Sequence, residues 1–173
     1  MIYKDKKSIF KNRAIEIAKL PVLEDNQEYI EVLVFSLSDE KYAINTSFIE
    51  EVTIIKDLTE IPFVPPFIKG VINIRGHIYS IVDLTILFNL KKSDQAITKA
   101  KTIIIKSEDM EFGIYTDNLE GVMRISKADI KESPLGVSDS SRDYISGITS
   151  DNLIILDTSK LLSDKKMIVN QEI

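Results

Sequence analysis

Short runs rich in β-branched residues alternate with turn signals along most of the chain, and this pattern is typical of β-strands. Helical periodicity is confined to the two ends and to short pieces near 84–89 and 158–163. The predicted strands cover residues 32–37, 42–44, 71–75, 77–82, 102–106, 112–115, 122–125, 145–149 and 153–156. We therefore assign the chain to the mostly β class.

The strand pattern repeats within the chain. The segment VLVFSLSDEKYAINTSFIEEV (32–52) matches TIIIKSEDMEFGIYTDNLEGV (102–122) at an offset of seventy residues. Two related β-units fit two small barrels better than one long sheet, because closed barrels leave no exposed strand edges. The polar stretch 91–100 is the expected junction between the two halves.

A second repeated segment ends on an aspartate that precedes a short helical pattern. GHIYSIVDLTILF (76–88) resembles SDNLIILDTSKLL (150–162), so Asp83 and Asp157 take equivalent places. An aspartate before a helix caps it well, because its carboxylate accepts hydrogen bonds from free amides of the first turn. We interpret both aspartates as structural caps rather than as catalytic groups.

Composition narrows the class of protein. The chain has 173 residues, with 44% hydrophobic and 28% charged residues, as expected of a soluble globular protein with a real core. It contains no apolar run long enough to span a membrane and no secretory signal. The absence of cysteine excludes disulfides and thiolate chemistry, and we expect a cytoplasmic protein. The net charge of −5, without a basic block, argues against nucleic acid as a partner.

The sequence offers no catalytic constellation. His77 is the only histidine; it follows the turn glycine Gly76, and we interpret it as a solvated loop residue. No phosphate-binding or nucleophile-elbow motif is present. The acidic pairs at 39–40 and 108–109 occupy equivalent hairpin turns, where polar residues are usual. We expect no enzymatic activity, no metal and no cofactor.

Two charged residues interrupt apolar segments. Glu51 lies between Ile49 and Val52, and Arg75 lies within VINIRG. Both fit the solvent-facing positions of half-buried strands, and both also fit a mixed charged and apolar patch that contacts a partner. Periodicity alone leaves these two alternatives open.

The same stretch carries a family resemblance. PFIKGVINIRGHIYSIVDL (66–84) resembles the most characteristic motif of the CheW family of chemotaxis coupling proteins, F-I-x-G-V-x-N-[LI]-R-G-x-[IV]-x-P-[IV]-x-D-[LM]. The hairpin before it and the second half of the chain are also similar to the family, over about residues 29 to 163. Ser80 departs from the motif, because the family usually has proline there.

The resemblance implies a fold and a role. The family fold consists of two interlocked five-stranded SH3-like barrels, in agreement with the repeat. Here an N-terminal helix and a short helix after each half would accompany the barrels, and Gly70 and Gly76 of the motif would be structural. Family members are adaptors that couple transmembrane chemoreceptors to the regulatory domain of the CheA histidine kinase, without inserting into the membrane. The chain would then act in the cytoplasm, recruited to membrane-associated receptor arrays.

The resemblance also implies two binding surfaces. The receptor's cytoplasmic hairpin tip would contact the positions that match the family's receptor-binding residues, namely Ile49, Glu51, Asn73 and Arg75. The kinase contact transfers only to a region, the proline-rich loop with Phe63, Val64 and Phe67; the side chain of Phe67 fits a barrel plug slightly better. A scaffold for another output, such as surface motility or second-messenger synthesis, and a small-ligand module are the alternatives.

The predicted domain organisation has three parts. Residues 1–28 form an extension in which residues 6–20 show the periodicity of an amphipathic helix, docked either on the chain itself or on a partner. Residues 29–165 form the CheW-like domain, with repeat halves at about 29–90 and 101–163. Residues 166–173 form a C-terminal tail.

Overall fold

Strands make up most of the regular structure in the computed structural model, which describes residues 27–91, 100–116, 118–132 and 139–168. The strands are β1 (Tyr29–Leu37), β2 (Glu40–Asn45), β3 (Ile49–Ile54), β4 (Ile68–Ile74), β5 (His77–Val82), β6 (Lys101–Lys106), β7 (Glu111–Thr116), β8 (Asn118–Ser126), β9 (Ile145–Ile148) and β10 (Ile154–Leu156). The helices are α2 (Leu84–Leu87), α3 (Asp139–Arg142) and α4 (Thr158–Leu161). The mostly β class is confirmed. The helix predicted within residues 6–20 and most of the expected junction lie outside the described residues.

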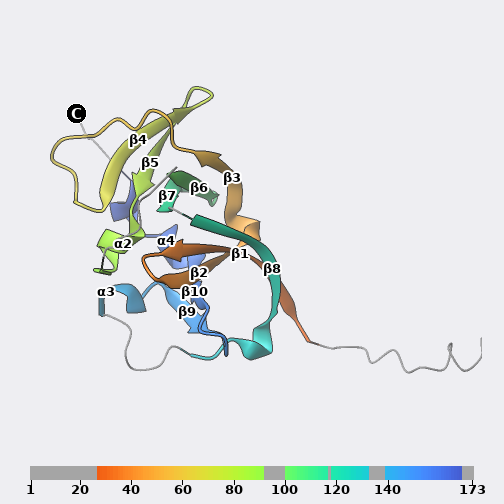
Figure 1. Cartoon of the computed structure of the whole chain (residues 1–173). Coiled ribbons are helices and arrows are strands. Elements are labelled where there is room, and N and C mark those ends of the chain that lie inside the picture. The colour runs from red at the N-terminus through yellow and green to blue at the C-terminus, as the bar shows by residue number, and fades with distance from the viewer. Residues whose placement is uncertain (1–26, 92–99, 117, 133–138, 169–173) are drawn as a thin grey trace, which may run out of the picture.

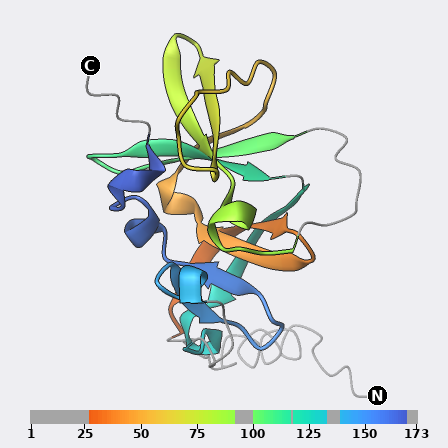
Figure 2. The same ribbon diagram turned by 90° about the vertical axis from the view of Figure 1, so that its left-hand side faces the viewer.

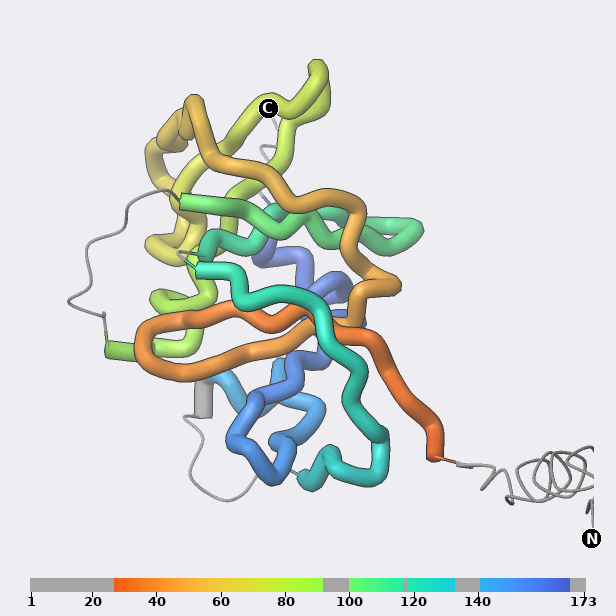
Figure 3. The backbone as a smooth tube through the Cα atoms, turned by 45° about the vertical axis from the view of Figure 1, so that its right-hand side comes forward, coloured from red at the N-terminus to blue at the C-terminus, as the bar shows by residue number. Residues whose placement is uncertain are grey.

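The strands form two five-stranded sheets, and each sheet takes strands from both halves of the chain. The β1 sheet has the order β8-β1-β2-β10-β9, and the β6 sheet has the order β3-β6-β7-β5-β4 (Figure 1). Each sheet therefore joins the first hairpin of one half to the last three strands of the other. Figure 3 shows β8 on one side of the orange β1–β2 hairpin, with β10 and β9 on the other. This exchange interlocks the halves and confirms the two interlocked barrels.

Three apolar clusters fill the fold. The largest lies between the two sheets, since it combines residues such as Phe35 of β1 and Ile105 of β6. Two smaller clusters belong to one sheet each: Val34 lies in one and Ile104 in the other. Because side chains alternate along a strand, β1 and β6 bury both of their faces. This double burial explains why both strands read as continuous apolar runs.

The strand β3 is the one that the sequence pattern did not predict. Its side chains alternate between half-buried and more exposed positions, and it forms an edge of the β6 sheet. Two adjacent glutamates and a threonine interrupt its apolar residues, so the apolar run used to predict the other strands is missing here. The adjacent glutamates Glu50 and Glu51 therefore lie on a strand, at the margin of a sheet.

The repeat extends to a glycine at the third position of the fourth strand in each half, β4 and β9. Gly70 of β4 and Gly147 of β9 lie in the similar segments FIKGV (67–71) and YISGI (144–148). A Cβ atom at Gly70 would lie 2.2 Å from the Thr59 carbonyl oxygen, and one at Gly147 would lie 2.5 Å from the Lys131 carbonyl oxygen. Both glycines thus admit the backbone of the preceding loop, which forms an isolated β-bridge to the next residue of the strand.

Candidate functional site

The hairpin of β4 and β5 projects from the body of the molecule (Figure 2). The strand register places Arg75 in the turn at its tip. Ile74 pairs with His77, so Arg75 and Gly76 alone form the turn, with φ values of +52° and +89°. Positive φ at both central residues is characteristic of the type I′ turn, which favours glycine at its second position. The backbone N–H of Gly76 donates to Asn73 Oδ1 at 2.8 Å. The Asn73 side chain therefore fixes the turn that carries Arg75.

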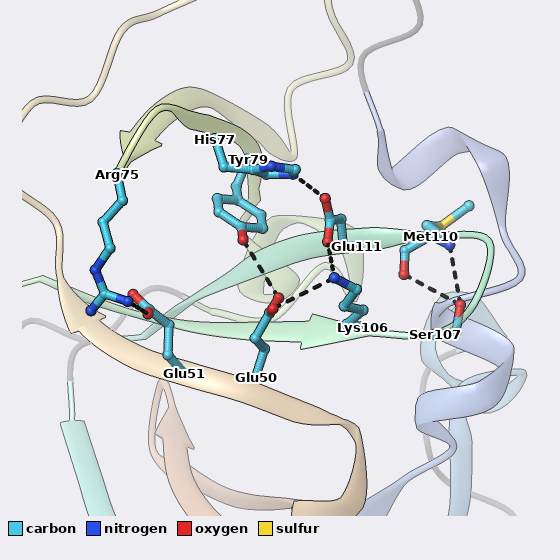
Figure 4. Close-up of polar contacts among 9 residues, drawn as sticks. All are labelled: Glu50, Glu51, Arg75, His77, Tyr79, Lys106, Ser107, Met110 and Glu111. Carbon is cyan, nitrogen blue, oxygen red and sulfur yellow. Dashed lines mark hydrogen bonds and ion pairs between the residues drawn. The ribbon is translucent and has the colours of Figure 1, made fainter.

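The Arg75 side chain reaches from this turn to β3. Its Nη1 atom lies 3.4 Å from Glu51 Oε2, with the two side chains 85% and 26% exposed (Figure 4). The β4–β5 hairpin and β3 lie at opposite ends of the strand order, so this ion pair spans the barrel opening. An exposed pair of this kind contributes little to stability. The arginine has more donors than the pair uses, so it can bind a further acceptor.

The structure sets Ile49 apart from the other three predicted receptor-binding residues. A bulge at Glu50 places Ile49 opposite Ile105 and Glu51 opposite Ile104. Neighbouring residues of β6 face opposite sides of the sheet. Ile49 accordingly packs against the core between the sheets, whereas Glu51 reaches Arg75. The structure thus brings Glu51, Asn73 and Arg75 together, with Ile49 on the other face of β3.

A ring of polar side chains lies beside this pair (Figure 4). Lys106 Nζ lies 3.5 Å from Glu50 Oε1 and 3.2 Å from Glu111 Oε2. The Tyr79 hydroxyl donates to Glu50 at 3.5 Å, and the rings of Tyr79 and His77 lie 4.6 Å apart. His77 closes the ring through its contact with Glu111. His77 is exposed, as predicted, but it does not lie in the loop, because a two-residue turn leaves it paired at the start of β5.

The charges of this ring shift the pKa values of its members. The hydrogen bond and the charge of Glu111 raise the pKa of Lys106, and Glu50 adds to that effect. Burial works to raise the pKa of Glu111, but hydrogen bonds with Lys106 and His77 outweigh it and lower the value. Burial, together with the negative charges of Glu50 and Glu111, raises the pKa of Tyr79. Lys106 and Glu111 are therefore charged around neutral pH, whereas Tyr79 stays protonated and neutral.

The predicted kinase-binding loop divides into exposed and buried residues. Phe63 is fully exposed and has a φ of +62°, which is rare for an aromatic residue. Val64 is half-buried. Phe67 packs against the core between the sheets, and its carbonyl accepts the Asp83 backbone N–H at 2.7 Å. In the other half, the Tyr144 carbonyl accepts the Asp157 backbone N–H at 2.8 Å. Phe67 and Tyr144 are therefore equivalent residues of the repeat, and both pack against the core between the sheets.

Both aspartates lie at helix N-caps. The Asp83 carboxylate accepts from the backbone N–H of Thr85 at 2.9 Å, and the Asp157 carboxylate accepts from that of Lys160 at 3.1 Å. Asp83 is also buried and lies 3.4 Å from Lys69 Nζ. These contacts are the structural role that the sequence predicts, and they occupy both carboxylates.

Two exposed apolar residues lie near Arg75, and sequence reasoning missed one of them, Ile78. Ile54 on β3 is 44% exposed and Ile78 on β5 is 65% exposed. Ile54 also lines a pocket of about 230 Å³ together with Asn73 and Arg75. Isoleucine in a strand pattern predicts burial. Ile78 is exposed on the projecting hairpin, and Ile54 is exposed at the end of the edge strand β3.

Other kinds of site were sought among the described residues. In residues 27–91, 100–116, 118–132 and 139–168, no group of three or more His, Asp or Glu side chains is placed to hold a metal ion. Within the same ranges, no helix has the length and apolar character needed to cross a membrane.

Two interlocked barrels that display a charged hairpin tip define a class of protein that acts through its surfaces, a binding scaffold. The chain belongs to the CheW family, since the family model of the CheW-like domain matches residues 31–166. Chains of this family are scaffolds of chemotaxis signalling, so this protein is a non-catalytic adaptor and not an enzyme.

Individual relatives agree with this assignment. The chain is 32% identical to the chemotaxis protein CheW of Thermotoga maritima over 149 residues, which cover 84% of this chain and 95% of that protein. It is 28% identical to the chemotaxis protein CheW of Treponema pallidum, over 82% of this chain and 87% of that protein. The crystal structure of the scaffolding protein TtCheW from Thermoanaerobacter tengcongensis superposes with a TM-score of 0.65 at 27% identity, covering 77% and 86% of the two chains.

Proposed function

We propose that this chain couples chemoreceptors to a CheA-type histidine kinase, with a receptor-binding face centred on the Glu51–Arg75 pair. The observation that carries the proposal is the geometry of that pair, in which a turn fixed by Asn73 holds an exposed guanidinium against a carboxylate of β3. The relatives named as chemotaxis proteins support the pathway.

The surroundings of the pair favour a protein partner. Arginine and exposed aliphatic residues are enriched at binding hot spots, and both occur here. The pocket next to Arg75 adds a depression lined in part by Ile54 and Ile74. The tip of a receptor hairpin would fit this surface by placing an acceptor on Arg75 and an apolar side chain beside Ile54. Ile49 would support the position of β3 from the other face.

We place the kinase contact on a second surface of the same barrel. Phe63 is the most exposed large apolar side chain among the described residues, at 104%. The proline-rich loop around Phe63 and Val64 loses little conformational entropy when a partner binds it. Phe67 is not included, because its side chain packs against the core.

The coupling itself can be tested by reconstitution. The kinase regulatory domain is immobilised, and a soluble receptor hairpin fragment is added with or without the chain. We expect the fragment to be retained only when the chain is present. Phe63→Ala should release both the chain and the fragment, whereas Glu51→Lys should release the fragment alone. Equal retention of the fragment with and without the chain would contradict the coupling role.

We further propose that the chain acts in the cytoplasm at membrane-associated receptor arrays. The relatives described above carry chemotaxis names, so we favour chemotaxis over surface motility or second-messenger synthesis as the output. No observation favours a small-ligand module as a second candidate function.

A further inference from the structure

The two barrels differ in the opening between the third strand and the last hairpin. In the β6 sheet, this opening lies between β3 and the β4–β5 hairpin and holds the pocket of about 230 Å³. In the β1 sheet, the equivalent opening lies between β8 and the β9–β10 hairpin and holds a pocket of about 440 Å³. One barrel therefore has a much larger open pocket than its repeat.

The size of the larger pocket is explained by the residues that take the place of the Glu51–Arg75 ion pair in the β1 sheet. The repeat places Gly121 where β3 has Glu51. The turn between β9 and β10 (149–153) contains no arginine, and its residue with positive φ is Asn152, at +60°. Neither a glycine nor an asparagine can form the ion pair that spans the opening in the β6 sheet. The opening of the β1 sheet is therefore left without this bridge.

The larger pocket is lined by apolar residues and by charged residues of both signs. Val34, Met123 and Leu153 contribute apolar surface, and the Met123 side chain is 46% exposed. Of the basic lining residues, Lys41 is paired with Glu120, and Arg124 lies over the Tyr29 ring. Asp129 and Asp151 also line the pocket, and neither forms an ion pair with another described residue. An apolar surface with unpaired carboxylates suits an amphipathic segment that carries positive charge.

We propose that residues 9–20 of the same chain dock in this pocket. Phe10, Ala14 and Ile17 recur at helical spacing and would cover Met123 and Leu153. Residues 9–20 contain three lysine and arginine residues and one acidic one, so their charge complements Asp129 and Asp151. This inference is independent of the proposed coupling function.

The path of the chain supports this occupant. Tyr29 at the start of β1 pairs with Ser126, which itself lines the pocket. Glu28 is held beside it by an ion pair of 2.7 Å with Lys127. The preceding chain therefore leaves the barrel at the edge of the pocket. Residues 21–28 can span at most about 3.5 Å each, or roughly 28 Å, which is enough to return a helix across the opening.

The chain offers a direct measurement of this contact. It contains no cysteine, so Ser8→Cys introduces a single attachment point for a nitroxide label. Among the four methionines, Met123 lines the pocket, whereas Met110 and Met167 are buried in the core between the sheets. The labelled full-length chain carries ¹³C-methyl methionine and is diluted into unlabelled chain, so that only contacts within one molecule are seen.

Docking predicts that the Met123 methyl signal loses most of its intensity, while the signals of Met110 and Met167 are largely kept. Phe10→Ser should restore the Met123 signal, and the matched control Asn12→Ser, on the opposite face of the predicted helix, should not. Equal intensities for all three methionines would overturn the proposal. Broadening of Met123 seen only between different molecules, or only after a partner is added, would also overturn it, because the occupant would then be a second copy or another protein.

Discussion

The third strands of the two barrels are equivalent, yet they carry different residues at one position. β3 contains Ile49-Glu50-Glu51-Val52 and β8 contains Leu119-Glu120-Gly121-Val122. In both strands the first glutamate is the bulge residue, and it contacts the first hairpin of the opposite half: Glu50 contacts Lys106, and Glu120 contacts Lys41 and Ser36. The bulge is therefore part of the shared barrel.

The next position differs between the strands. Glu51 forms an ion pair with the turn of its barrel, whereas Gly121 has no side chain and a φ of +128°. Residues that recur in both halves hold the fold, and residues present in only one half are the candidates for partner binding. Glu51 and Arg75 belong to the second group.

The largest expected loss of stability concerns Gly70, a glycine that recurs in the other half as Gly147. Gly70→Ala should reduce the free energy of unfolding by roughly 3 kcal/mol or more, because the new Cβ would collide with the Thr59 carbonyl at a φ of +144°. Gly121→Ala is the matched control: its φ of +128° is also strained, but no atom lies within 4 Å. Its expected loss is about 1 kcal/mol. Urea unfolding measures both, and equal losses would show that the close approach of Thr59 is unimportant.

Replacing the two helix caps, Asp83 and Asp157, should cause smaller losses of stability than Gly70→Ala, and the two losses should differ. Asp83→Ala removes the Thr85 hydrogen bond and leaves Lys69 without its buried partner, so we expect a loss of about 2 kcal/mol. Asp157→Ala removes a more exposed cap and should cost about 1 kcal/mol. Asp83→Asn keeps the capping oxygen and should recover part of the loss. Thermal unfolding measures these losses of stability. A larger loss in Asp157→Ala than in Asp83→Ala would contradict the expected order.

The sequence predicted those features that depend on local pattern. The repeat was visible because β1 and β6 bury both faces and read as apolar runs, and the caps were visible because Asp83 and Asp157 each precede a short helical pattern. The strand β3 was missed because an edge strand is only half-buried. His77 was misplaced because the length of a turn decides whether its neighbours pair.

Contacts between distant segments were beyond the sequence pattern. Glu51 and Arg75 meet only because the β6 sheet curves until β3 faces the β4–β5 hairpin. The exchange of strands rests on the parallel pairings of β10 with β2 and of β5 with β7, for which the local pattern contains no signal. The separation of Ile49 from Glu51 depends on a bulge.

The smallest expected effect concerns Glu111, whose equivalent in the other half is Lys41. The pKa of Glu111 is below its usual value in the folded chain, so its carboxylate stabilises the fold above the unfolded value of about 4.5. That contribution is lost as the pH falls through the folded pKa. Glu111→Gln should therefore lower the stability by less than about 1 kcal/mol at neutral pH, and the difference from wild type should vanish in acid.

The control for this comparison is Glu108→Gln, in the exposed turn between β6 and β7. It should leave the stability unchanged at every pH. Chemical unfolding from neutral to acidic pH measures all three chains. A gap between Glu111→Gln and wild type that widens in acid would contradict the assigned role of Glu111.

The central claim is that the turn with Arg75 binds the receptor and that the equivalent turn with Asn152 does not. Titration of a receptor hairpin fragment against wild type, Arg75→Glu and Asn152→Asp, with melting curves for each, tests it directly. We predict that Arg75→Glu weakens binding by about 1–3 kcal/mol, roughly tenfold to a hundredfold, with little change in melting temperature. Asn152→Asp should bind like wild type. Unchanged affinity in Arg75→Glu, or an equal loss in Asn152→Asp, would contradict the claim.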